Sequence, residues 1–259
     1  MEAGSVKFFF LILILLTGNY SCRNKSEDNS LSVKEYIELG VPDPGKKWEM
    51  ADYTQAHNAL AKIKWERPLQ LPVKDSKKSE TVFERMLSLD YLSFLQDSAI
   101  SLNEKAERIS EFVIVHDYWI DIYTNPALRK KNYYHRELID ICIFDLQLKE
   151  EMLKLAHEIN KSDDPSDVAL QYGYNSIKMN YLSALADALK IQRHTSQFLE
   201  KDRERITDSI YLSVTRNREW MDDSVIIELK RSLQLVMDSA SSNYIRNKYM
   251  TLEKVLSSH

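Results

Sequence analysis

Apolar residues recur at intervals of three and four along most of this chain, which is the period of one face of an α-helix. The clearest stripes are Tyr53, Ala56, Leu60, Ile63; Ile109, Phe112, Trp119, Tyr123; Tyr174, Ile177, Tyr181, Ala184, Ala188, Ile191; Ile206, Ile210, Val214; Ile226, Leu229, Leu233, Val236; and Ile245, Tyr249, Leu252, Leu256. Each stripe predicts a helix that packs one side against the rest of the protein.

The longest predicted helix runs from Pro126 to about Lys161. Its stripe is Tyr134, Leu138, Ile141, Asp145, Leu148, Met152, Leu155 and Ile159. Between residues 141 and 146 nearly every position is apolar, so both sides of the helix are expected to be covered. This pattern places the helix at the centre of the fold.

Capping signals predict where other helices begin. Ser32 and Glu35 form a capping-box pattern, and Gly40 follows as a stop signal. Ser101 with Glu104 predicts the start of the helix that carries Ile109. Thr81 with Glu84 predicts a helix reaching about residue 98, with Phe83, Leu87, Tyr91 and Phe94 on its apolar side. The segment 66–78 contains two prolines and Lys74, Lys77 and Lys78, and it is expected to be a basic loop.

Glycine and proline are too rare in the body of the chain to divide it into strands. Gly173 is the only glycine after Lys46, and the two late prolines follow Asn125 and Asp164, as expected at helix starts. No residue pair suited to a tight hairpin turn occurs. The sequence therefore predicts an all-α fold, an irregular antiparallel bundle of about eight or nine helices in one domain over 32–259. A repeat-like α-solenoid is the alternative.

The first thirty residues have the features of an export signal. An apolar run at residues 8–16 follows Lys7, and it is too short to span a bilayer as a helix. Cys22 comes six residues after the run and is followed by polar residues. This segment resembles a bacterial lipoprotein signal. The resemblance implies that 1–21 is a removed signal peptide, that Cys22 carries lipid, and that 22–31 is a polar tether. An ordinary cleaved signal and an uncleaved anchor are the alternatives.

Charge and cysteine content exclude several classes of protein. The 259 residues include 35 Lys and Arg against 39 Asp and Glu, a net charge of −4, which provides no general attraction to nucleic acid. Two cysteines are too few for a disulfide scaffold or a cysteine-rich zinc site. Cys142 lies in an apolar helical run and is expected to be a buried free thiol, with a Cys22–Cys142 disulfide as the alternative.

Two polar residues occupy positions on core stripes. His116 falls between Phe112 and Trp119, and Asp145 falls between Ile141 and Leu148. A buried carboxylate needs a partner, so His116 and Asp145 are a possible buried pair if their helices are neighbours. In the alternative, the two residues are not paired and have only a structural role: His116 bonds to a backbone carbonyl and Asp145 lies near a gap between helices.

His116 and Asp117 also form a His-Asp pair, with His57 before it and Asp187 after it. This order resembles that of metal-dependent phosphohydrolases with an all-helical fold, and the resemblance implies a divalent metal. No other catalytic or cofactor motif occurs: there is no His-Glu-x-x-His, Walker loop, Gly-x-Ser-x-Gly or Cys-x-x-Cys. We therefore assign no catalytic residue, no metal ligand and no cofactor from the sequence.

These features favour a binding protein over an enzyme. The expected function is that of a membrane-tethered helical lipoprotein on the extracytoplasmic side of the cell envelope, facing the periplasm or at the cell surface. It would act by protein–protein interaction, as an immunity or inhibitor protein or as an accessory subunit of an envelope complex. Its expected partners are the membrane, through the lipid anchor, and another protein, but not nucleic acid. The alternatives are an envelope hydrolase with a site centred on His116 and a small-ligand binder with an interhelical cavity.

Overall fold

The computed structural model describes residues 28–124, 133–161, 173–193 and 198–258. In these ranges there are nine α-helices, two 3₁₀ helices and no strand. The elements are α2 (Val33–Glu38), α3 (Met50–Glu66), α4 (Glu80–Met86), η1 (Leu89–Gln96), α5 (Leu102–Tyr123), α6 (His135–Asn160), α8 (Tyr174–Arg193), α9 (Glu200–Asn217), η4 (Arg218–Trp220), α10 (Asp223–Ser239) and α11 (Asn243–Ser257). The prediction of an all-α fold is confirmed.

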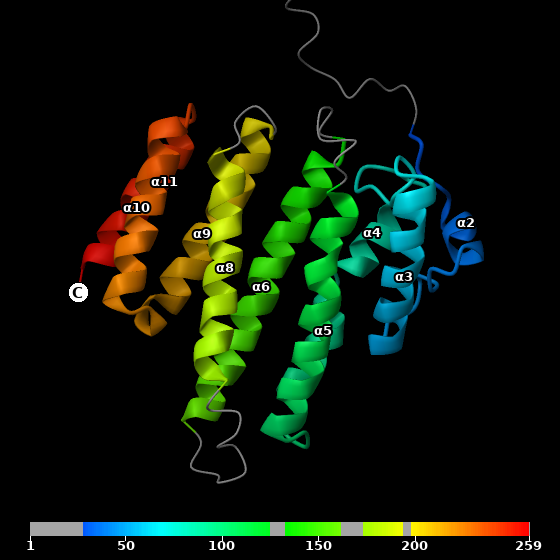
Figure 1. Cartoon of the computed structure of the whole chain (residues 1–259), viewed down its shortest axis with the longest axis horizontal. Helices are drawn as coiled ribbons and strands as arrows, with labels where there is room; N and C mark the ends of the chain where they lie inside the picture. The colour runs from blue at the N-terminus through cyan, green and yellow to red at the C-terminus, as the bar shows by residue number, and fades with distance from the viewer. Residues whose placement is uncertain (1–27, 125–132, 162–172, 194–197, 259) are drawn as a thin grey trace, which may run out of the picture.

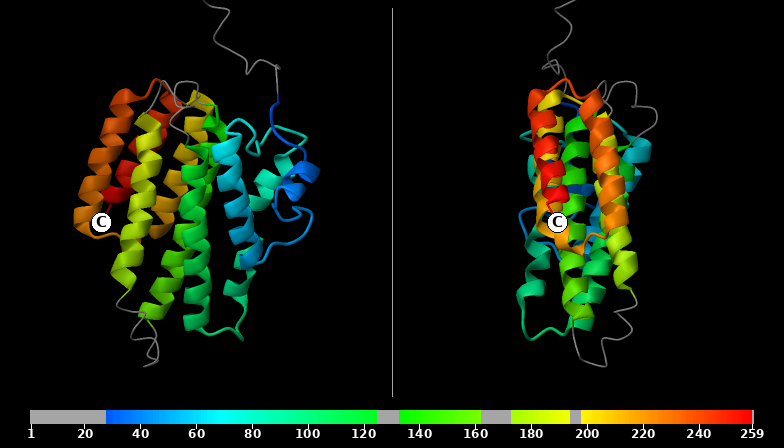
Figure 2. Two further views of the ribbon diagram at one scale, coloured as in Figure 1. Left: turned by 45° about the vertical axis from the view of Figure 1, so that its right-hand side comes forward. Right: turned by 90° about the vertical axis from the view of Figure 1, so that its left-hand side faces the viewer.

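The long helices stand side by side, and successive helices from α5 to α11 run in alternate directions (Figure 1). Helices α8, α9, α11 and α10 pack in a ring, each against the next. Helix α6 lies against α8 and α9 on one side and against α5 on the other. Helix α5 also packs against α3, and these two helices run in the same direction. The body is much narrower when it is viewed from its α10 and α11 end (right panel of Figure 2). This is the irregular, mainly antiparallel bundle that the sequence predicts.

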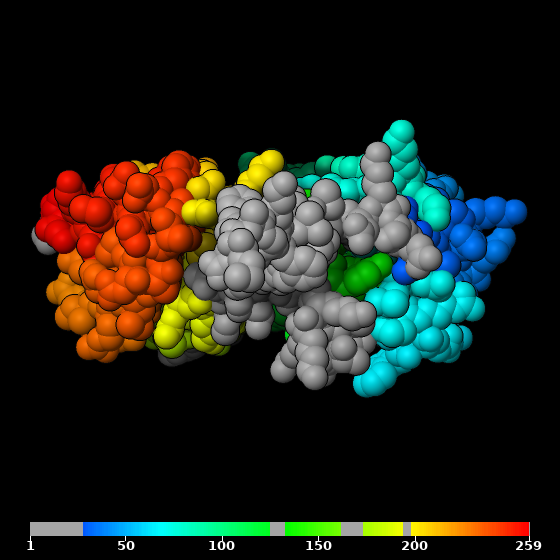
Figure 3. Space-filling view, turned by 90° about the horizontal axis from the view of Figure 1, so that it is seen from above, coloured from blue at the N-terminus to red at the C-terminus, as the bar shows by residue number. Residues whose placement is uncertain are grey.

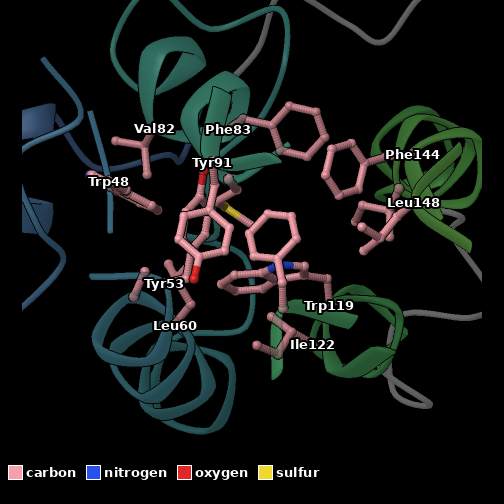
Figure 4. Close-up of a cluster of buried hydrophobic side chains, with 14 of the residues drawn as sticks. Trp48, Tyr53, Leu60, Val82, Phe83, Tyr91, Trp119, Ile122, Phe144 and Leu148 are labelled. Carbon is pink, nitrogen blue, oxygen red and sulfur yellow. The ribbon is translucent and has the colours of Figure 1, made fainter. Parts of the chain in front are cut away.

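Helix α6 is central because two hydrophobic clusters meet on it. Ile141, Phe144 and Leu148 belong to the cluster shared with the helices before α6. Ile139 and Leu146 belong to the cluster shared with the helices after it. Figure 4 shows the first cluster, in which residues of α6 face aromatic side chains from α3, α4, η1 and α5. The apolar character of residues 141–146 on every side therefore reflects burial of both faces.

Several predicted helix boundaries and core positions are confirmed. Tyr53, Ala56, Leu60 and Ile63 are the buried residues of α3. The capping box at Ser32 and Glu35 has both of its reciprocal hydrogen bonds. Gly40, just after α2, has a φ of 97°, a conformation that glycine adopts without the steric cost of a Cβ atom.

The single helix predicted from Thr81 to about residue 98 is wrong. Helix α4 has Ser79 at its N-cap and ends at Met86, and η1 follows as a separate 3₁₀ helix. The Ser88 side chain accepts the N–H of Asp90, which in a continuous helix would bond to the Met86 carbonyl. A local side-chain hydrogen bond thus replaces a helical one and breaks the helix.

The central helix also starts at a different residue from the one predicted. The prediction places its start at Pro126, whereas α6 begins at His135 after a turn at 133–134. Pro126 itself and the predicted helix start at Asp164 and Pro165 lie outside the described residues.

Candidate functional site

His116, the polar residue on the core stripe of α5, is buried with 1% of its surface exposed. Its Nδ1 lies 2.7 Å from the carbonyl oxygen of Phe112, and its Nε2 lies 3.0 Å from the carbonyl oxygen of Met86. The rings of Phe112 and Phe144 pack against the imidazole. Because the helix breaks after α4, the Met86 carbonyl has no helical N–H partner. Nε2 of His116 occupies the place of that partner.

The imidazole is held in its neutral form. Burial lowers the pKa of His116 to about 4, although the two carbonyls act in the opposite direction. A neutral imidazole has one N–H and can donate to only one of the two carbonyl oxygens. Because each nitrogen faces a carbonyl oxygen, neither one is directed at a space where a substrate or metal could bind.

Asp145, the polar residue on the core stripe of α6, is 5% exposed and lies next to Lys149. Lys149 donates to Oδ2 of Asp145 at 3.2 Å, and its Nζ lies 2.8 Å from Oδ1 of Asp117 on α5. Burial raises the pKa of Asp145 to about 6 against the attraction of Lys149. Burial alone would lower the pKa of Lys149, but the two carboxylates raise it above its ordinary value. Lys149 thus joins two helices through two carboxylates, of which that of Asp145 is buried and that of Asp117 is about half exposed.

The structure buries both His116 and Asp145, as the stripes predict, but it does not pair them. His116 uses its two nitrogens on backbone carbonyls, and the ion-pair partner of Asp145 is Lys149. Successive residues of a helix point about 100° apart, and Asp117 rather than His116 is directed toward Lys149. The arrangement of His116 matches the structural alternative, in which it bonds to a carbonyl.

The four residues of the His-Asp pattern do not form a metal site. His57 packs its ring against Tyr118 and Trp119, with centroids 5.4 Å and 5.8 Å away, and Asp187 pairs with Lys190 on α8 at 2.7 Å. Among the described residues, no three or more His, Cys, Asp or Glu side chains are grouped so that they could hold a metal ion. The resemblance to metal-dependent phosphohydrolases therefore does not extend to the arrangement of side chains.

Cys142 is a buried free thiol, as predicted from its apolar surroundings. Burial raises its pKa to about 12, so the thiolate needed for reaction is scarce at neutral pH. Cys22 lies outside the described residues.

The sequence analysis missed a buried cation, Arg203 on α9, which is 2% exposed. Its Nη1 donates to the carbonyl of Gln192 at 3.4 Å and its Nη2 to Oγ of Ser241 at 3.5 Å. Gln192 is in the last turn of α8, where carbonyls lack helical partners and a positive charge is favourable. A signal was available, since Arg203 lies three residues before Ile206 and seven before Ile210, on the same stripe.

The sequence analysis also missed a cleft of about 380 Å³ between η1, α6 and α9. One side is apolar, with Leu89, Leu92 and Leu95, and the other is polar. Glu150 lines the polar side, where its Oε1 lies 3.4 Å from Nζ of Lys154 and 3.5 Å from Nη1 of Arg216. Glu150 continues the second apolar face of α6 at Leu146, four residues earlier, so the period of that face could have identified it.

Large apolar side chains are exposed at the end of α3 and on the outer side of α5. Trp65, at the end of α3, has 82% of its surface exposed. Ile114 and Tyr118 are one turn apart on α5, and at least half of each is exposed. Leu69 in the following loop is also exposed. These side chains provide apolar contact area that the folded chain does not use.

Within the described residues, no helix has both the length and the apolar character needed to cross a bilayer. Comparison of the chain with protein-family models, with curated proteins and with solved structures finds no match.

Proposed function

We propose that this protein is a membrane-tethered helical lipoprotein of the cell envelope that acts outside the cytoplasm by binding another protein. Two kinds of observation support the proposal. The apolar run at residues 8–16 and Cys22 resemble a lipoprotein signal. The body is a bundle of packed helices that presents apolar side chains at fixed positions on its surface.

The exposed face of α5 is the observation that carries the binding role. Ile114 and Tyr118 are on one side of a 22-residue helix whose opposite side is buried, so their positions are fixed by the core. The Tyr118 ring also packs against His57 of α3. Large side chains held on a rigid element lose little conformational entropy on binding, which favours their use as contact residues. An immunity or inhibitor protein and an accessory subunit of an envelope complex would both use such a face.

Affinity purification of the full-length protein from its detergent-solubilised native envelope tests the binding role. The expected result is a stoichiometric partner that is retained with wild type and lost with Tyr118→Asp. Ile227→Asp is the matched control, because Ile227 is an exposed apolar residue on α10, and it should retain the partner. Equal recovery with both variants would exclude the α5 face as the binding surface.

The anchor has a separate test. Cys22→Ala should move the protein out of the membrane fraction, because the residue that would carry the lipid is removed. If the variant stays in the membrane fraction, the lipoprotein proposal is wrong.

The cleft between η1, α6 and α9 supports a second candidate function, binding of a small ligand. Its volume of about 380 Å³ lies within the range of ligand pockets, and it combines an apolar wall with a buried carboxylate. Leu89→Trp should fill part of the cleft, since Leu89 is an exposed residue of its apolar wall, and abolish the thermal stabilisation produced by any compound that binds there. Retained stabilisation would show that the compound binds elsewhere. We do not propose the hydrolase, since both nitrogens of His116 face carbonyl oxygens.

A further inference from the structure

The end of the molecule where α3 terminates carries an exposed indole and several unpaired cations. Trp65 is the most exposed large apolar residue among those described. Lys64 and Arg67 flank it in the chain, and Lys77 and Lys78 follow in the loop after α3. Lys64 and Lys78 donate to backbone carbonyls, and none of the four forms an ion pair with a described carboxylate. We call Lys64, Trp65, Arg67, Leu69, Lys77 and Lys78 the basic–aromatic surface.

The charge of this surface is opposite to that of the whole chain. Residues 62–78 contain six Lys or Arg and two Asp or Glu, a formal charge of +4 in a chain of net charge −4. Asp28 and Glu35 lie within electrostatic range of Lys78, Asp140 pairs with Lys74 and Arg136 pairs with Asp75; counting all four still leaves a formal charge of +2. Glu35 is also within range of Arg67, so the cations from α3 and from the loop belong to one end of the molecule.

The N-terminal end of the described chain is attached to the same place. Lys78 donates to the carbonyl of Asp28 at 3.2 Å, and the hydroxyls of Ser30 and Ser76 are 2.8 Å apart. Figure 1 shows that the described chain begins where α3 ends, and Figure 3 looks onto this end, where the first described residues (blue) lie beside α3 and its loop (cyan). A membrane anchor on the N-terminal segment therefore holds this end of the bundle closest to the membrane.

The distance from the proposed lipidated residue is short. Asp28 is six residues after Cys22, and six extended residues span at most about 20 Å. If Cys22 holds lipid in a bilayer, Lys78 is restricted to within about that distance of the headgroups, and so is the surface around it.

We propose that the basic–aromatic surface lies against an anionic lipid bilayer, with Trp65 in the headgroup region; this inference rests on the proposed lipid anchor. Indole rings favour the membrane–water interface, where the apolar ring and the N–H are both accommodated. Lysine and arginine near the surface are attracted to anionic headgroups, and a basic patch is a common second signal beside an acyl chain. The bilayer thus fixes the orientation of the bundle and leaves the face of α5 accessible from the side.

Tryptophan fluorescence in vesicles tests the orientation. The full-length protein, purified from membranes, is reconstituted into vesicles of phosphatidylglycerol and phosphatidylethanolamine that contain lipid with brominated acyl chains. Trp48, Trp119 and Trp220 emit in both proteins, so subtracting the emission of Trp65→Phe isolates Trp65. The emission of Trp65 should shift to the blue and fall at least about twofold through quenching by the bromines, since interfacial indoles lie near the acyl chains.

Two control variants make the test specific. Lys77→Gln should lower the ratio of docked to undocked protein about fivefold, the effect expected for one cation near an anionic membrane. Lys254→Gln, which removes an exposed lysine from α11, should leave the ratio unchanged. Ile227→Trp in the Trp65→Phe background places an exposed indole on α10 and should not be quenched.

The outcomes separate this inference from the anchor. Protein that floats with the vesicles while Trp65 is unquenched overturns the orientation and leaves the anchor intact. Equal quenching of Trp65 and of the indole at position 227 also overturns it. If the protein does not float with the vesicles, the anchor is refuted, and the proposed orientation, which depends on the anchor, is refuted as well.

Discussion

Asp145 is the residue whose charge should affect the stability of the bundle most clearly. Its carboxylate is buried on α6 beside Lys149, and Lys149 has a second carboxylate partner in Asp117, 2.8 Å away. Asp145→Asn keeps the shape of the side chain and removes its charge. Lys149 stays paired with Asp117, so the substitution leaves no buried ammonium without a counterion.

The expected magnitude follows from the pKa of Asp145. Burial raises it from 3.8 to about 6 in the folded protein, and one pKa unit corresponds to about 1.4 kcal/mol. Because the folded pKa is raised, ionisation destabilises the fold. The penalty is absent below the unfolded pKa near 3.8, grows as the pH rises toward 6, and reaches about 3 kcal/mol above it. Asp145→Asn should therefore be more stable than wild type at pH 7, and the two should converge near pH 4.

Urea denaturation at pH 4, 5, 6 and 7 measures this difference. The free energy of unfolding of Asp145→Asn minus that of wild type should increase by about 2 to 3 kcal/mol from pH 4 to pH 7. Asp238→Asn is the control, because it removes an exposed carboxylate from α10 that contacts neither Asp145 nor Lys149, and it should leave the pH dependence as in wild type. A constant difference between Asp145→Asn and wild type across this range would refute the reasoning.

Three further predictions follow from single residues. Gly40→Ala should destabilise the protein by about 1 kcal/mol in denaturation, because φ is 97° there while the nearest atom to an added Cβ is 3.9 Å away, so the cost is conformational. His116→Phe should cost about 1 to 3 kcal/mol in the same assay, since it removes the buried imidazole N–H that donates to one of the two carbonyls facing the ring, those of Phe112 and Met86; a smaller loss would mean that water replaces the imidazole. Cys142 should react with a thiol reagent only after unfolding, because its thiol is buried and its pKa is about 12; rapid modification of the native protein would contradict this.

The sequence by itself determined the helices and most of their buried faces. The stripes of α5, α9, α10 and α11 are buried where the period of three and four places them. This succeeds because helical periodicity and capping act between residues at most four apart, which the sequence shows directly. The central position of α6 could also be predicted, since only a helix covered on both sides is apolar all round.

Only the tertiary structure decided what the buried polar groups contact. The partner of His116 is a carbonyl exposed by the break after α4, and that break depends on a local hydrogen bond of Ser88. The partner of Asp145 is Lys149, four residues away on the same helix, a spacing that the sequence shows and that the sequence analysis did not use. The contact of Lys149 with Asp117 and that of His116 with the Met86 carbonyl cross between helices, so they depend on which helices are neighbours and how each is rotated about its axis. Those relations are set by packing over the whole bundle, and no local pattern encodes them.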